Sequence, residues 1–326
     1  MNIVNSIKLA SNMNTYPKKV KIIEVGPRDG LQNEKQIVSA QDKIKFIELL
    51  TEAGLKNIEV GSFVHPKLIP QLADTEEVIK RLEQKKDLTY LALVPNMKGF
   101  ERAKEAGIKR IAVFTACSET FNKNNINMSI QESLDTFKPV VKNALENRMS
   151  VRGYISMGFV CPFEGKIPKE KALHVTESLL NLGVDEVSLG DTVGKASSEE
   201  VYETVNFILK SIPKEKIALH FHDTYNKALE NVEAGLRLGI TTFDSSAGGL
   251  GGCPYAPGAP GNLATEDFVD FLNKNNIQSG IDLEKLAKAS LFMQTVLGKQ
   301  LPSKVLQRLS AKPCHSRENG NPGNQH

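Results

Sequence analysis

The sequence has little that would tie the chain to an oxidising compartment, a nucleic acid or a membrane. Its four cysteines are widely spaced with no C-x-x-C pair, no lysine- or arginine-rich block stands out, and the net charge is only +3. No apolar run approaches the length that spans a bilayer. These absences argue against a disulfide framework, a zinc knuckle, nucleic-acid binding and membrane association. A reducing interior, the cytoplasm of a bacterial-type cell, is the expected compartment.

Neither end of the chain has the pattern of a targeting or catalytic segment. Residues 1–19 carry three lysines but no arginine and no apolar core, so a mitochondrial transit peptide and a signal peptide are both disfavoured. Residues 311–326 are rich in Pro, Gly and Asn and have almost nothing to bury. We therefore predict an N-terminal extension over 1–19, one domain over 20–300, and a C-terminal segment over 301–326 that is disordered from about 311.

The middle of the chain alternates short β-branched runs with longer amphipathic patterns, about every thirty residues, as βα units require. The predicted strands are Val20–Val25, Asn57–Phe63, Thr89–Val94, Arg110–Thr115, Val151–Phe159, Glu186–Leu189, Ile217–His222 and Thr242–Ser245. The predicted helices include Gln41–Ala53, Ser129–Asn147, Lys169–Leu182, Ser198–Lys210 and Asn226–Leu238. Gly54, Gly107, Gly183 and Gly239 each follow a helical pattern, where a residue with positive φ commonly ends the helix.

Eight strands alternating with helices predict an α/β fold with a parallel sheet that closes as a (β/α)8 TIM barrel. Two further patterns, Thr265–Asn273 and Asp282–Leu297, predict appended C-terminal helices. The alternative is a doubly wound sheet. That fold would want a Gly-rich phosphate turn after the first strand, and the segment Gly26–Gly30 does not supply one.

Two histidines at the end of the seventh strand are the most informative pair in the chain. Side chains alternate faces along a strand, so His220 and His222 point the same way. A lone histidine is more often a satisfied core or surface residue. Here the pair lies at a strand's end with the carboxylate of Asp223 nearby, so it is interpreted as half of a metal site.

Polar groups gather at the carboxyl ends of the other predicted strands, which is where TIM barrels place their active sites. They are Arg28 and Asp29 after the first strand, Glu59 on the second, Asp191 and Thr192 after the sixth, and residues 247–253 after the eighth. Chance would scatter such groups over both ends. Asp29 could join the two histidines in a nitrogen and oxygen site suited to Mg²⁺ or Mn²⁺.

The segment Gly248–Asn262 is so rich in Gly and Pro that we expect neither helix nor strand there, but a mobile loop over the barrel mouth. Cys253 lies in its middle and is a candidate nucleophile or acid/base group. No histidine adjoins it in sequence, which favours a proton donor. Asn262 ends the segment, and its amide oxygen could complete the metal shell.

Several of these segments together resemble the hydroxymethylglutaryl-CoA lyase family. They are Gly26-Pro-Arg-Asp-Gly-Leu-Gln-Asn-Glu34, Ile58-Glu-Val-Gly-Ser-Phe63, Ser188-Leu-Gly-Asp-Thr192, His220-Phe-His-Asp-Thr-Tyr225 and the cysteine segment from Gly248 to Glu266. The resemblance covers roughly residues 20–300. The family belongs to the metal-dependent aldolase-type barrels, with the isopropylmalate and homocitrate synthases. Those synthases carry a Gly-Glu-Arg-x-Gly-Asn pattern at this loop, which is absent here.

The resemblance implies a barrel, usually dimeric, that uses Mg²⁺ or Mn²⁺ to split an acyl-CoA, 3-hydroxy-3-methylglutaryl-CoA, into acetyl-CoA and acetoacetate, as in leucine degradation and ketone body formation. The implied metal ligands are Asp29, His220, His222 and Asn262. The implied catalytic residues are Arg28, Cys253, Glu59 and Asp191, and those on the substrate side are Arg28, Gln32, Asn125 and Thr192.

Three alternatives stay open at this point: a lyase for a longer 3-hydroxyglutaryl-CoA analogue, a synthase that condenses acetyl-CoA with a 2-oxo acid, and a metal-binding scaffold without activity. The base that takes the hydroxyl proton is also open. Asp29, Glu59, a metal-bound water and a histidine could each serve.

Overall fold

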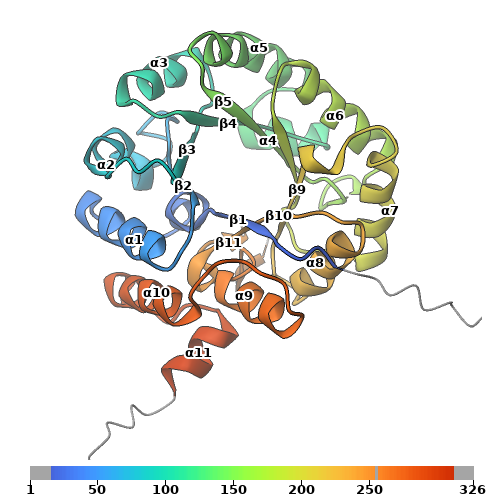
Figure 1. The fold of residues 1–326 in the computed structure, drawn as a ribbon. Coiled ribbons are helices and arrows are strands. Elements are labelled where there is room, and N and C mark those ends of the chain that lie inside the picture. The colour runs from blue at the N-terminus through green and yellow to red at the C-terminus, as the bar shows by residue number, and fades with distance from the viewer. Residues whose placement is uncertain (1–15, 254–255, 312–326) are drawn as a thin grey trace, which may run out of the picture.

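The computed structural model describes residues 16–253 and 256–311. Eight parallel strands close into a barrel in the order β1-β10-β9-β8-β5-β4-β3-β2, with helices around the outside (Figure 1). The barrel strands are β1 (Lys21–Glu24), β2 (Asn57–Ser62), β3 (Thr89–Leu93), β4 (Arg110–Ala116), β5 (Ser150–Ser156), β8 (Glu186–Asp191), β9 (Ile217–Phe221) and β10 (Thr242–Ser245). The predicted (β/α)8 TIM barrel is confirmed, and all eight predicted strands are present.

Eight helices surround the barrel in the described part of the chain. They are α1 (Ala40–Glu52), α2 (Thr75–Arg81), α3 (Met97–Ala106), α4 (Glu119–Ile126), α5 (Ile130–Glu146), α6 (Lys169–Asn181), α7 (Ser198–Ile208) and α8 (Ala228–Arg237). The five with predicted bounds (α1, α5, α6, α7 and α8) begin and end close to those positions. Gly54, Gly107, Gly183 and Gly239 all have positive φ, as predicted. The fifth strand is shorter than predicted, because Met157 adopts a left-handed φ of 54° that ends the extended backbone after Ser156.

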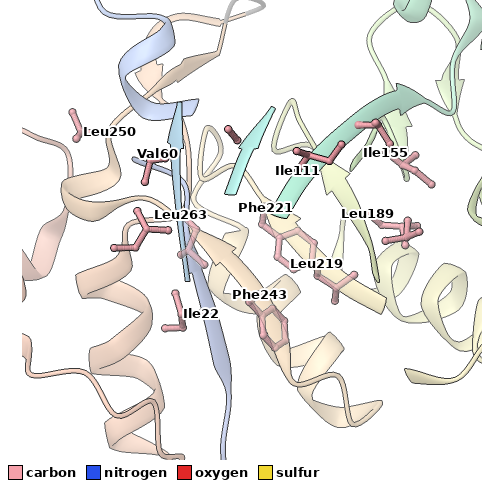
Figure 2. Packing of buried hydrophobic residues seen from close by; sticks show 14 of the residues in the cluster. Ile22, Val60, Ile111, Ile155, Leu189, Leu219, Phe221, Phe243, Leu250 and Leu263 are labelled. Carbon is pink, nitrogen blue, oxygen red and sulfur yellow. The ribbon is translucent and has the colours of Figure 1, made fainter. Parts of the chain in front are cut away.

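Alternation along the strands divides the buried side chains into two sets. Ile22 points outward into the large core between strands and helices, which Figure 2 shows from close by, whereas Ile23 belongs to a small inner cluster. The inner cluster comprises Ile23, Val25, Leu91, Leu93, Ala112 and Tyr154. The barrel interior is therefore a packed core, and the site must lie at one end of it.

Three helices follow the eighth strand: α9 (Thr265–Lys274), α10 (Leu283–Leu297) and α11 (Lys304–Ser310), drawn in orange and red in Figure 1. Helix α10 packs against α1, and α11 packs against α9. The first two were predicted, and α11 lies in the predicted C-terminal segment. The predicted disorder from about 311 falls almost wholly outside the described residues. In the described part of the chain, no helix is both long and apolar enough to cross a membrane.

Two short elements at the carboxyl ends of the strands were not predicted. A π-helix, η1 (Gly26–Gly30), follows β1, and a 3-10 turn, η4 (Ala247–Gly249), follows β10. After η4, β11 (Gly252–Cys253) pairs with β12 (Ala256–Pro260) as an antiparallel hairpin. The prediction that Gly248–Asn262 holds no strand is therefore wrong. A two-stranded ladder tolerates proline and glycine, because most of its backbone groups need no partner in a larger sheet.

Candidate active site

The predicted half-site on β9 is completed by a residue that follows β1, two strands away in the barrel. Asp29 on η1, His220 at the end of β9 and His222 just beyond it each offer a ligand atom, and these atoms lie within 4.8 Å of one another. Burial, with a smaller contribution from His220, lowers the pKa of His222 to about 3 against the opposing charge of Asp29. A neutral imidazole keeps a nitrogen lone pair free, which is the form that binds a cation.

Asn262 closes the cluster from the end of the glycine-rich segment. Its Nδ2 group donates to Asp29 Oδ2 at 2.8 Å and to the Leu250 carbonyl at 3.1 Å. Its Oδ1 atom is buried and has no hydrogen-bond partner in the described structure. An unpaired buried amide oxygen beside a carboxylate and two imidazoles suits a divalent cation, which would accept that lone pair. The four predicted ligands therefore fit the metal.

The π-helix η1 presents Arg28 next to Asp29. The guanidinium of Arg28 donates from Nε to Glu59 Oε2 and from Nη1 to Asp29 Oδ1, both at 2.7 Å. Burial opposes ionisation of Asp29, but Arg28 and the two histidines outweigh it and lower its pKa to about 2. Burial raises the pKa of Glu59, although Arg28 opposes that shift. The Arg28 guanidinium is therefore held between two carboxylates, and its remaining N–H groups are available to a substrate.

The glycines before Cys253 have a conformational purpose. Gly248, Gly249 and Gly251 have φ values of 67°, 72° and 122°, a region that residues with a Cβ rarely adopt. A Cβ at Gly251 would also lie 2.7 Å from Asn262 Nδ2. These glycines let the chain turn tightly beside the candidate metal ligand and lead directly into β11, which carries Cys253. The side chain of Cys253 lies outside what the structure describes.

The remaining predicted site residues have different surroundings. The Asp191 carboxylate accepts from the backbone N–H groups of Lys195 (3.2 Å) and Ala196 (2.9 Å), so it holds the loop after β8, and burial raises its pKa to about 6. Thr192 Oγ1 accepts from the Met157 N–H at 3.3 Å. Gln32 is half-buried, and its Oε1 atom has no partner among the described residues. Asn125 is exposed on α4, so its place beside a substrate stays a prediction.

Sequence reasoning missed two buried carboxyl groups behind these elements. Glu24 on β1 accepts from the N–H groups of Gly26 and Ala247, each at 2.8 Å, and so connects η1 with η4. Glu266 on α9 accepts from the Gly248 N–H at 2.8 Å and from the Ser290 hydroxyl. Burial raises the pKa of Glu24 to about 7 and that of Glu266 to about 8. A glutamate directly after two isoleucines in a predicted strand was the available signal for Glu24.

A family model described as HMGL-like matches residues 19–293, which include every candidate metal ligand. The chain belongs to this family. A hydroxymethylglutaryl-CoA lyase of Bacillus subtilis is 49% identical over 292 residues, covering 90% of this chain and 98% of that protein. A Pseudomonas aeruginosa relative, 48% identical over 91% of this chain and 99% of its own length, is named 3-hydroxy-3-isohexenylglutaryl-CoA/hydroxymethylglutaryl-CoA lyase.

Solved structures of HMGL-like proteins share the fold. The crystal structure of a hydroxymethylglutaryl-CoA lyase from Pseudomonas aeruginosa superposes with a TM-score of 0.90 at 47% identity, covering 92% of this chain and 99% of that one. An HMG-CoA lyase from Acinetobacter baumannii, solved with coenzyme A and 3-methylmalate, gives a TM-score of 0.85 at 37% identity, covering 94% and 98%. The HMGL-like chain described here is thus an enzyme of the carbon–carbon lyase class.

Proposed function

We propose that this protein is a hydroxymethylglutaryl-CoA lyase. In the proposed reaction the C3 hydroxyl loses its proton, the C2–C3 bond breaks, acetoacetate leaves, and the enolate of acetyl-CoA takes a proton at C2. The observation that carries the proposal is the meeting of Asp29, His220 and His222 ligand atoms within 4.8 Å, directly beside a guanidinium that is braced by Glu59. Relatives about half identical over nine tenths of the chain have this activity in their names.

The residues that would hold the cation are Asp29, His220, His222 and Asn262, the last through its unpaired Oδ1 atom. Oxygen and nitrogen ligands without a thiolate suit Mg²⁺ or Mn²⁺. When bound, such an ion lowers the pKa of a coordinated hydroxyl and fixes the orientation of the substrate. The protein's own part is to hold these four side chains ready, through the hydrogen bond of Asn262 to Asp29 and the ion pair of Asp29 with Arg28.

Arg28 would stabilise the enolate. Its guanidinium is held by Glu59 and Asp29, so it needs little rearrangement when negative charge develops on the thioester oxygen of the substrate. Arginine stays charged at every accessible pH, and both carboxylates favour that charge further. Cys253 on β11 would protonate the enolate carbon, since it comes two residues after Gly251, where a Cβ would lie 2.7 Å from Asn262 Nδ2.

Two further properties belong to this proposal. We expect the protein to act as a homodimer, as the family resemblance implies, and to work in the cytoplasm, as its widely spaced cysteines indicate. Size-exclusion chromatography with light scattering tests the first, and fractionation of the source cells tests the second. A monomeric active enzyme would refute the dimer without affecting the proposed reaction.

The deciding experiment is a coupled assay that detects acetoacetate formed from 3-hydroxy-3-methylglutaryl-CoA. We expect turnover that stops with EDTA and returns with Mg²⁺ or Mn²⁺. A parallel assay with the 3-isohexenyl analogue tests a second substrate, which the name of the Pseudomonas aeruginosa relative supports. Incubation with acetyl-CoA and 2-oxo acids tests the synthase alternative by release of free CoA. No acetoacetate under any metal condition would refute the proposal.

A further inference from the structure

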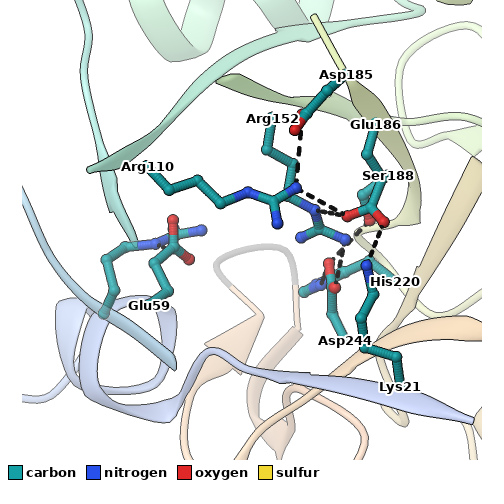
Figure 3. A network of polar contacts seen from close by, with 10 residues as sticks. Lys21, Glu59, Arg110, Arg152, Asp185, Glu186, Ser188, His220 and Asp244 are labelled. Atoms are coloured by element: carbon teal, nitrogen blue, oxygen red, sulfur yellow. Dashed lines mark hydrogen bonds and ion pairs between the residues drawn. The ribbon is translucent and has the colours of Figure 1, made fainter. Parts of the chain in front are cut away.

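A chain of buried charges runs through the barrel from its amino-terminal end to the candidate metal site (Figure 3). Arg152 on β5 is fully buried in the interior, where a lone guanidinium would be very unfavourable. Its Nε donates to Glu186 Oε1 at 2.9 Å, and its Nη2 donates to Asp244 Oδ1 at 2.7 Å. Lys21 pairs with Glu186 Oε2 at 2.7 Å, and Arg110 pairs with Glu186 Oε1 at 3.4 Å.

Asp244 on β10 connects this chain to the site. Strands β10 and β9 pair so that Asp244 stands directly beside His220. The Asp244 Oδ2 atom accepts from the Ser188 hydroxyl at 2.8 Å and lies 3.3 Å from Nδ1 of His220. The Nδ1 atom is buried and makes no aligned hydrogen bond in the described structure, and Asp244 is its recorded ion-pair partner. Nε2 is therefore the nitrogen of His220 that remains for a cation.

These contacts select one tautomer of the imidazole. If Nδ1 carries the proton, its N–H lies next to a carboxylate charge at 3.3 Å, a favourable electrostatic contact. If Nδ1 carried the lone pair, it would lie 3.3 Å from the lone pairs of a buried carboxylate and be repelled by them. The geometry therefore favours Nδ1–H with the Nε2 lone pair free. A carboxylate behind a ligating histidine fixes ring orientation and tautomer in just this way in metal sites.

We propose that Asp244 and Arg152 are positioning residues for the cation: Asp244 holds His220 in the Nδ1–H tautomer, and Arg152 holds Asp244 in place. The inference rests on the proposed role of His220 as a metal ligand. Arg152 suits its task because its planar fork reaches Glu186 and Asp244 at once, which a lysine cannot do. The network also ties the position of His220 to strands β5, β8 and β10 together.

The test compares Asp244→Asn with Asp185→Asn. Both change a carboxylate of the same network to an amide, but Asp185 contacts Arg110 at the outer end and its side chain is 45% exposed. An asparagine at 244 can donate to Nδ1 and so permits the opposite tautomer. Binding of Mn²⁺ is measured by electron paramagnetic resonance of the free ion, and the His220 tautomer by ¹⁵N NMR of the metal-free protein. His220→Ala provides the benchmark for a lost ligand, and circular dichroism checks the fold.

We expect Asp244→Asn to bind Mn²⁺ about 10- to 100-fold more weakly and to show an Nε2–H signal for His220. Asp185→Asn should match the wild type in both measurements. Arg152→Lys should weaken Mn²⁺ binding by a smaller factor, since the charge stays but one contact is lost. Wild-type Mn²⁺ affinity in Asp244→Asn would overturn the inference and leave the proposed metal site standing.

Two outcomes do not depend on the folding of any variant. An Nε2–H signal for His220 in the wild-type protein would overturn the inference directly. A wild-type protein that binds no Mn²⁺ would overturn both this inference and the proposed metal site. A third outcome uses a variant: unchanged binding in a folded His220→Ala would refute the ligand role on which the inference rests.

Discussion

Replacing Glu266 by glutamine should make the protein more stable at neutral pH, and more so as the pH rises. Glu266 is fully buried on α9, and burial raises its pKa from 4.5 to about 8. Glutamine can keep both contacts: its carbonyl oxygen accepts from the Gly248 N–H, and its amide donates to the Ser290 hydroxyl. The substitution therefore removes only the free-energy cost of keeping a buried carboxyl group protonated.

The magnitude follows from linkage between proton binding and folding. The stability that this group supplies is fully present below pH 4.5 and is lost as the pH rises toward 8, because the unfolded chain releases the proton first. A pH of 7 lies about 2.5 units above the pKa of this carboxyl group in the unfolded chain, and each unit corresponds to about 1.4 kcal/mol. Glu266 therefore lowers the free energy of unfolding at pH 7 by about 3 kcal/mol. At pH 5 the same reasoning gives less than about 1 kcal/mol.

The assay is urea unfolding of both proteins at pH 5 and pH 7, at one protein concentration, followed by far-UV circular dichroism because the chain has no tryptophan. Glu186→Gln is the matched control. Burial opposes ionisation of Glu186, but Arg152 and Lys21 outweigh it and keep its pKa below the usual value. The control should therefore lose stability at pH 7, by about 3 kcal/mol or more. A Glu266→Gln protein that is no more stable at pH 7 than at pH 5, relative to wild type, would refute the reasoning.

Three further predictions concern the site. Asp29→Ala should keep the fold and bind Mn²⁺ at least about tenfold more weakly, which calorimetric titration would show; unchanged affinity would remove Asp29 from the ligand set. Arg28→Lys should lose about 10²-fold or more in kcat with little change in KM, because its donors matter most as enolate charge appears; a raised KM with normal kcat would make Arg28 a binding residue. Cys253→Ser should keep Mn²⁺ affinity and lose about 10²-fold in kcat, with Cys117→Ser as the control at a buried cysteine; full activity after alkylation of Cys253 would rule out the proton-donor role.

The barrel could be predicted from the sequence because each of its βα units has a local sequence pattern. Each βα unit repeats a short buried run and an amphipathic helix, and both signals are read within about fifteen residues. The histidine pair was equally local, since strand alternation alone places His220 and His222 on one face. Even Asp29, far away in sequence, could be assigned because all parallel strands deliver their carboxyl ends to the same rim.

Contacts between side chains on strands far apart in the sequence could not be predicted, because no local pattern relates them. Arg152 lies in a strand and Asp244 in another, and nothing short of the closed barrel shows that they meet at 2.7 Å. The prediction for the segment that forms β11 and β12 was wrong for a related reason. Its Gly and Pro content is typical of a loop, but the two strands need only each other, so composition gave the wrong answer.

The π-helix shows how these two kinds of information combine. An extra residue in the turn at Gly26–Gly30 brings Arg28 and Asp29 to the rim on consecutive positions, one facing Glu59 and the other facing the histidines. That turn is not held by its own bonds alone: Glu24, one residue before Val25, accepts from the N–H groups at both Gly26 and Ala247. A single buried carboxyl therefore fixes the relative position of the arginine that would stabilise the enolate and the segment that carries Cys253. The cost of burying it is offset by these hydrogen bonds, which keep the two halves of the site in register.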